Sequence, residues 1–127
     1  MKIVAFGAST HKTSINKALA TYTAGLVEGA EVKVLDLNDY EMPLYTQDRE
    51  EELAPLPEAQ RFLDYIASAD ALVISFAEHN GHYPAAYKSL FDWASRTNRD
   101  VYAHKPAVYL SASPGPGGAK SVLGAAL

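Results

Sequence analysis

Cysteine is absent from this chain of 127 residues, which excludes disulfides, thiolate zinc sites, iron–sulfur clusters and cysteine nucleophiles. An excess of basic residues is absent too. There are 11 Lys and Arg against 15 Asp and Glu, and the net charge of -4 favours neither a nucleic-acid footprint nor a basic membrane surface. No apolar run approaches the roughly 18 residues of a membrane span, and the run before Gly7 is too short for the core of a signal peptide. We therefore expect a cytoplasmic enzyme or binding domain.

The remaining composition is typical of a globular protein. Apolar residues make up 48% of the chain and charged residues 20%, both ordinary values for a folded domain. The length suits one domain at about 150 residues per domain, so we expect residues 1–127 to form a single domain.

Four runs rich in apolar and β-branched residues predict strands, at Lys2–Phe6, Glu31–Leu37, Ala71–Phe76 and Pro106–Leu110. Most of these runs lack the polar alternation of a half-exposed strand. Continuous apolar runs are typical of strands that are buried on both faces of a parallel sheet.

Apolar residues at helical spacing lie between these strands. The first series, Ile15, Leu19, Tyr22 and Leu26, predicts a helix with Ser14 as its N-cap. Strands that alternate with helices predict a parallel sheet with right-handed crossovers and a helical layer on each face. The other predicted helices cover Pro57–Ser68, the segment from Pro84 and the segment from Ser121, and Asn38–Pro55 is expected to be a long exposed connection.

Three polar loops follow the carboxyl ends of predicted strands, the edge at which such sheets bind ligands. The first, Gly7–Asn16, combines hydroxyl side chains with a helix N-terminus, which favours an anion such as phosphate. The alternative is an ordinary capped turn in which Ser14 only caps the helix. The loop has neither the Gly-Lys-Ser/Thr ending of a Walker motif nor a GxGxxG pattern.

The second and third loops differ in what they offer to a ligand. In the second loop, Gly81 permits a tight turn and a close approach of backbone to a ligand. A metal site formed by Glu78, His79 and His82 is an alternative there, but it lacks a fourth ligand, so we expect no metal. In the third loop, Ser111–Gly118, many Gly residues would present backbone to a ligand; the alternative is a flexible surface loop.

With its three loop motifs, ASTHKTSINKAL, AEHNGHYPAAYKSLFDW and SASPGPGGAKSVL, the chain resembles the NAD(P)H-dependent FMN reductase family of flavodoxin-like proteins from end to end. The resemblance implies an α/β fold, a flavodoxin-like three-layer α/β/α sandwich with a parallel sheet. Flavodoxin-like sheets have the strand order 2-1-3-4-5. This chain supplies strands in the order 2-1-3-4, and the fifth strand of the family is absent from it.

The resemblance also implies an FMN site. The first loop would hold the phosphate, and the second and third loops would flank the isoalloxazine ring. Two residues depart from the family pattern: His11 stands where Arg is usual, and His79 where Tyr is usual. The implied cofactor-binding residues are Ser9, His11, Ser14, Ile15, Asn16, Glu78, His79, Asn80, Gly81, Ser113, Gly115, Gly117 and Gly118.

The implied activity is transfer of a hydride from NADPH or NADH through FMN to a flavin, quinone or azo compound. FMN would carry the chemistry, and no side-chain acid or base is required. Two alternatives remain open: a flavodoxin-type electron carrier without nicotinamide activity, and an inactive fragment.

A fourth strand at the rim of the sheet would leave an unpaired edge. We therefore expect that the chain is not a stable monomer. It would form a homodimer or homotetramer, pair with a chain that supplies the fifth strand, or lose order from Pro114 onward.

Overall fold

The sheet in the computed structural model, which describes residues 1–127, has four parallel strands in the order β2-β1-β3-β4. The strands are β1 (Lys2–Ala8), β2 (Glu31–Leu35), β3 (Ala71–Phe76) and β4 (Ala107–Ser111). β1 pairs with β2 and β3, and β3 pairs with β4. The predicted fold class and strand order are confirmed.

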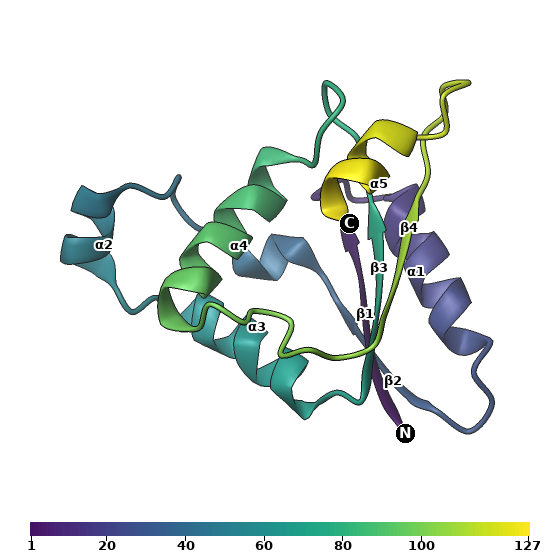
Figure 1. The fold of residues 1–127 in the computed structure, drawn as a ribbon, viewed down its shortest axis with the longest axis horizontal. Coiled ribbons are helices and arrows are strands. Elements are labelled where there is room, and N and C mark those ends of the chain that lie inside the picture. The colour runs from purple at the N-terminus through teal and green to yellow at the C-terminus, as the bar shows by residue number, and fades with distance from the viewer.

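Helices cover both faces of this sheet (Figure 1). α1 (Ile15–Gly25) lies on one face. α3 (Pro57–Ser68), α4 (Ala85–Thr97) and α5 (Lys120–Ala126) lie on the other. No helix has the length and apolar character that a membrane crossing requires.

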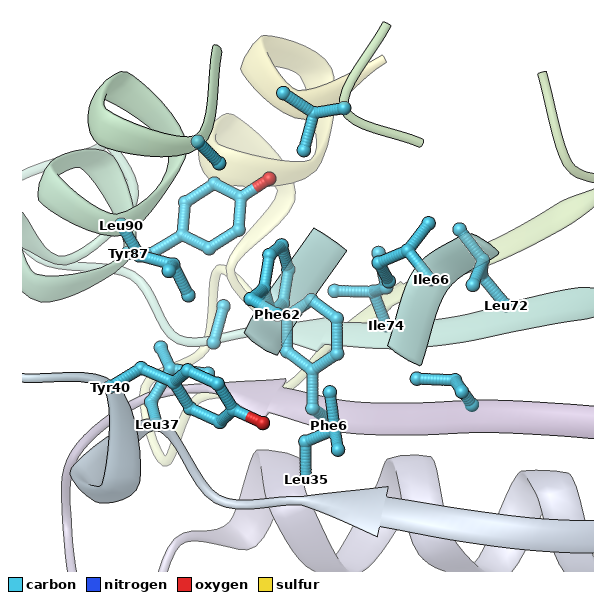
Figure 2. Packing of buried hydrophobic residues seen from close by; sticks show 14 of the residues in the cluster. Phe6, Leu35, Leu37, Tyr40, Phe62, Ile66, Leu72, Ile74, Tyr87 and Leu90 are labelled. Carbon is cyan, nitrogen blue, oxygen red and sulfur yellow. The ribbon is translucent and has the colours of Figure 1, made fainter. Parts of the chain in front are cut away.

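The larger part of the core lies under α3, α4 and α5. There the ring of Phe62 meets the rings of Phe6 and Tyr40 edge-to-face, with centroids 5.6 and 5.7 Å away (Figure 2). Such aromatic contacts add to the free energy gained by burying the rings. On the opposite face, α1 contributes only small side chains to the core, Ala20 and Ala24.

The buried face of α1 differs from the one that its apolar spacing suggests. Ile15, Tyr22 and Leu26 are 50%, 68% and 66% exposed, whereas the buried positions are Asn16, Ala20 and Ala24. The reason is the close approach of α1 to β1, where a Cβ on Gly7 would lie 2.4 Å from the backbone nitrogen of Lys17. Small residues therefore occupy the buried face.

The connection after β2 contains more structure than predicted. β2 ends at Leu35, and a 3-10 helix, η1 (Leu37–Tyr40), follows with Leu37 and Tyr40 buried. A short helix, α2 (Gln47–Leu53), buries no residue and projects from the side of the molecule beyond α4 (Figure 1). Its N-cap is Thr46, which accepts a hydrogen bond from the Arg49 N–H.

Candidate functional site

The three loops at the carboxyl ends of β1, β3 and β4 line one cleft of about 290 Å³, which we call the three-loop cleft. The structure therefore confirms the prediction that the three loops come together at one edge of the sheet. Eight of the implied site residues line the cleft, together with Thr13, Ala77, Ala112 and Pro114. The eight are Ser9, His11, Ser14, Ile15, Asn16, Glu78, His79 and Ser113.

Side-chain hydrogen bonds hold the first loop in its conformation. Ser9 Oγ accepts the His11 N–H at 3.2 Å, and His11 Nδ1 accepts the Thr13 N–H at 3.2 Å. Ser14 caps α1, since its Oγ accepts the Lys17 N–H at 3.1 Å. The predicted N-cap is confirmed, and these hydrogen bonds define the conformation of the first loop.

The start of α1 presents unpaired donors to the cleft. Ile15 and Asn16 line the cleft, and their backbone N–H groups make no hydrogen bond within the protein. The first turn of α1 carries no acidic residue. Free N–H groups at the positive end of a helix dipole favour an anion.

The side chain of Asn16 joins two of the loops. It is only 3% exposed. Its Oδ1 accepts the Ala112 N–H at 2.9 Å and the Ser75 hydroxyl at 2.8 Å, and its Nδ2 donates to the Ala112 carbonyl at 3.1 Å. The amide thus fixes α1 to β3 and to the end of β4 with its oxygen and one of its two N–H groups, and the backbone N–H of Asn16 is unpaired.

The second loop is a two-residue hairpin. His79 and His82 exchange backbone hydrogen bonds of 2.8 and 3.1 Å. Asn80 and Gly81 between them have φ of 53° and 78°, as the Asn-Gly turns of hairpins require. Neither turn residue lines the three-loop cleft, so both lie outside the pocket.

Glu78 links the second loop to the helix that follows the third. Its Oε1 accepts the Val122 N–H at 2.8 Å, in the first turn of α5, whose own N-cap residue Ala119 makes no side-chain cap bond. Glu78 thus caps α5 from a distant part of the chain. Sequence reasoning placed Glu78 at the site but gave no signal of this contact.

The glycines of the third loop lie outside the three-loop cleft. Ser113 lines it and also accepts the Gly115 N–H at 3.2 Å. Gly115, Gly117 and Gly118 do not line it. Gly118 has φ of 62°, a value that suits glycine.

A second pocket of about 390 Å³, which we call the η1 pocket, lies between the first loop, η1 and the start of α4. Sequence reasoning missed it, because η1 and its buried residues were expected to be exposed loop. Its lining residues are Thr10, Leu37, Asn38, Tyr40, Glu41, Met42, Leu44, Ala85, Ala86 and Ser89.

No group of three or more His, Asp or Glu side chains is placed to hold a metal ion. Glu78, His79 and His82, which the sequence analysis weighed as an alternative, do not form such a group, and the Glu78 carboxylate already accepts the Val122 N–H. The chemistry that the three-loop cleft supports is anion binding by hydroxyl and backbone donors.

Comparison with known proteins agrees with the resemblance noted in the sequence. A family model described as NADPH-dependent FMN reductase matches residues 1–126. An NAD(P)H-dependent FMN reductase of Pseudomonas aeruginosa is 33% identical over 116 residues, covering 91% of this chain and 61% of that protein. An NADPH:quinone oxidoreductase of Arabidopsis thaliana is 30% identical, covering 95% of this chain and 62% of that protein. The chain therefore spans about three-fifths of the length of these relatives.

Solved structures share the fold. FerB from Paracoccus denitrificans, described as a flavoenzyme NAD(P)H:(acceptor) oxidoreductase, superposes with a TM-score of 0.79 at 28% identity. That comparison covers 98% of this chain and 68% of that one. An azoreductase from Bacillus anthracis has a TM-score of 0.67 at 20% identity, which supports the fold alone.

Proposed function

Because the chain belongs to the NADPH-dependent FMN reductase family, we propose that it forms the FMN-binding domain of an NAD(P)H-dependent oxidoreductase. Bound FMN would supply the chemistry of hydride transfer from NADPH or NADH to a flavin, quinone or azo acceptor. The observation that carries the proposal is the three-loop cleft, where unpaired N–H groups of α1 face a pocket lined by hydroxyl side chains.

The donors of the first loop fit a phosphate group. The hydroxyls of Ser9, Thr13 and Ser14 and the backbone N–H groups of Ile15 and Asn16 surround the anion-favouring end of α1. Charge-assisted hydrogen bonds of this kind are among the stronger ones in proteins. His11, which stands where the family usually has Arg, offers an imidazole in place of a permanent cation.

Outside the three-loop cleft, the second and third loops offer backbone groups that a flat ring could contact. We propose that the Asn80-Gly81 turn and Gly117 present backbone N–H groups to the isoalloxazine edge, while Gly115 and Gly118, whose N–H groups are bonded to Ser113 Oγ and to the Gly115 carbonyl, shape the loop beside it. Backbone dipoles fixed in this way would stabilise negative charge on a reduced ring. His79, in the position usual for Tyr, would lie beside the ring, and Ser113 would close the opposite wall.

We propose that the protein acts in the cytoplasm, where nicotinamide cofactors are abundant, and that it self-associates as a homodimer or homotetramer. Exposed apolar side chains support self-association: Leu44 is 64% exposed, and Val108 on the outer strand of the sheet is 49% exposed. Light scattering at several concentrations tests this, and a monomer at all of them contradicts it.

The test of the proposed activity mixes the chain with FMN, removes free FMN by gel filtration, and follows NADH and NADPH oxidation with a quinone as acceptor. We expect flavin absorbance to elute with the protein and nicotinamide to be oxidised. Bound flavin without nicotinamide oxidation would indicate an electron carrier, and absence of bound flavin would contradict the proposal.

A further inference from the structure

Ser75 is a buried hydroxyl in a strand that is otherwise apolar. β3 has the sequence ALVISF, and its last five residues are buried. Ser75 itself is 0% exposed. Burying a hydroxyl costs free energy unless the group is hydrogen-bonded, and alanine or valine at the same place would carry no such cost. The hydroxyl therefore needs a polar partner inside the protein.

That partner is the side chain of Asn16 in the first turn of α1. Ser75 Oγ donates to Asn16 Oδ1 at 2.8 Å. Ser75 lies beside Gly7 in the sheet and two residues after Val73, which belongs to the core cluster under α1, so its side chain is on the face that α1 covers. Gly7 lets the backbone of α1 come close to the sheet, and Ser75 supplies the hydrogen bond beside that close approach.

The amide of Asn16 is held from two strands. It pairs with both the N–H and the carbonyl of Ala112, directly after β4, at 2.9 and 3.1 Å. The Ala112 pair ties α1 to the outer strand, and the Ser75 bond ties it to β3 in the interior of the sheet. A side chain held in this way cannot shift along one strand without losing its bond to the other.

The position of Asn16 matters to the three-loop cleft on two sides. The free backbone N–H groups of Ile15 and Asn16 form one wall, and Ala112 and Ser113 form part of another. The strength of a hydrogen bond depends on its angle as well as its length. A shift of Asn16 would therefore misdirect the donors of α1 and move them relative to the third loop. Ser75 itself does not line the cleft.

We propose that Ser75 is a positioning residue: it touches no ligand, but through Asn16 it directs the free N–H groups of α1 toward the phosphate, and so sets how strongly the cleft distinguishes FMN from riboflavin. The proposal rests on the proposed function and adds to it a residue outside the cleft. Donors that are fixed before binding strengthen a complex, because little conformational freedom is lost when the ligand arrives.

The first experiment compares calorimetric titrations of Ser75→Ala and the parent chain with FMN and with riboflavin. We expect the substitution to raise the dissociation constant of FMN about three- to tenfold and that of riboflavin less than about twofold. The control is Ser95→Ala, which removes a hydroxyl that donates to the Asp92 carbonyl on α4, outside the cleft. An equal loss for both flavins in Ser75→Ala would indicate a merely structural role and overturn the proposal.

A matched pair of variants separates the hydroxyl from the space it fills. Threonine and valine have the same shape, and only threonine can donate to Asn16. We expect Ser75→Thr to keep the parent preference for FMN and Ser75→Val to lose it by the same factor as Ser75→Ala. A preference that survives in Ser75→Val, or that is lost equally in Ser75→Thr, would contradict a role for the hydrogen bond.

A double-mutant cycle tests whether Ser75 acts through Asn16. Asn16→Ala removes the amide that joins Ser75 to Ala112. In that background we expect Ser75→Ala to leave the ratio of the FMN and riboflavin affinities unchanged. A further three- to tenfold fall in the ratio would show that Ser75 acts by another route and contradict the proposal.

Hydrogen exchange gives a readout that needs no ligand. In Ser75→Ala we expect exchange at the Ala112 amide to speed up at least about fivefold, because its acceptor is no longer held by β3. The Ala18 N–H, which donates to the Ser14 carbonyl in the first turn of α1, is the internal control, and its exchange should not change. Unchanged exchange at Ala112 would contradict the positioning of Asn16 by Ser75.

The same titrations distinguish failure of this proposal from failure of the proposed function. Equal affinity of the parent chain for FMN and riboflavin would contradict the proposed phosphate site, and with it the role of Ser75 in selecting FMN. A parent preference for FMN that Ser75→Ala leaves unchanged would contradict the role of Ser75 alone.

Discussion

Ser14 is the residue whose two predicted roles can be separated. Its hydroxyl caps α1 by accepting the Lys17 N–H and lines the three-loop cleft. In Ser14→Ala we expect FMN affinity to fall by about 1–3 kcal/mol, because a hydrogen bond to a charged group is lost. Calorimetric titration with FMN measures it. The control is Thr46→Ala, which removes the N-cap of α2 away from the cleft. If FMN affinity falls equally in both variants, the Ser14 hydroxyl does not contact the phosphate.

Glu78 acts at a distance from its own loop. Because its carboxylate accepts the Val122 N–H, Glu78→Ala should destabilise the protein by about 1–2 kcal/mol and speed hydrogen exchange in α5. Glu78→Gln keeps a carbonyl acceptor and should retain most of the stability. Urea unfolding and amide exchange at Val122 provide the readouts. Fast exchange in Glu78→Gln equal to that in Glu78→Ala would show that the negative charge, and not the hydrogen bond, holds α5.

At the scale of elements, the contact between β1 and α1 depends on Gly7. A Cβ there would meet the backbone of Lys17 at 2.4 Å, so Gly7→Ala should cost about 1–3 kcal/mol of unfolding free energy through overpacking. Gly25→Ala, at the end of the same helix where a Cβ meets nothing within 4 Å, should be neutral or stabilise by up to about 1 kcal/mol. Equal effects of the two substitutions on urea unfolding would contradict the close approach.

The junction of β2 and η1 should respond to acid. Hydrogen bonds from the Asn38 N–H and from Lys17 lower the pKa of Asp36 below its ordinary value of 3.8. A lowered pKa in the folded state stabilises the protein above the unfolded pKa, and this contribution is lost as the pH falls through the folded pKa. The difference in unfolding free energy between the parent chain and Asp36→Asn should therefore shrink between pH 6 and pH 3. A difference that does not change with pH would show that Asp36 acts only as a neutral acceptor.

The predictions from the sequence succeeded where a local pattern reports directly on structure. Runs such as Ala71–Phe76 gave the strands, and Ser14 gave a helix start. The apolar spacing of α1 located the helix but not its buried face, because the close approach at Gly7 is a tertiary effect. η1 and α2 were missed, since their residues carry no long apolar repeat.

At the scale of the whole molecule, the position of the cleft could be predicted from the sequence, but the hydrogen bonds between its loops could not. Three loops far apart in the chain meet in one cleft because parallel strands end at one edge. The engagement of Asn16 with Ala112, and of Glu78 with Val122, depends on distances between loops that no sequence pattern records. These two contacts tie the third loop and α5 to the rest of the site, so we expect the cleft to be formed before FMN binds.

The most direct test of the account compares calorimetric titrations of the chain with FMN and with riboflavin, which lacks the phosphate. If the first loop and the start of α1 bind phosphate, FMN should bind with one-to-one stoichiometry and at least about tenfold more tightly than riboflavin, a difference of about 1.4 kcal/mol or more. Equal affinity for the two compounds, or no binding of FMN, would contradict the assignment of the three-loop cleft.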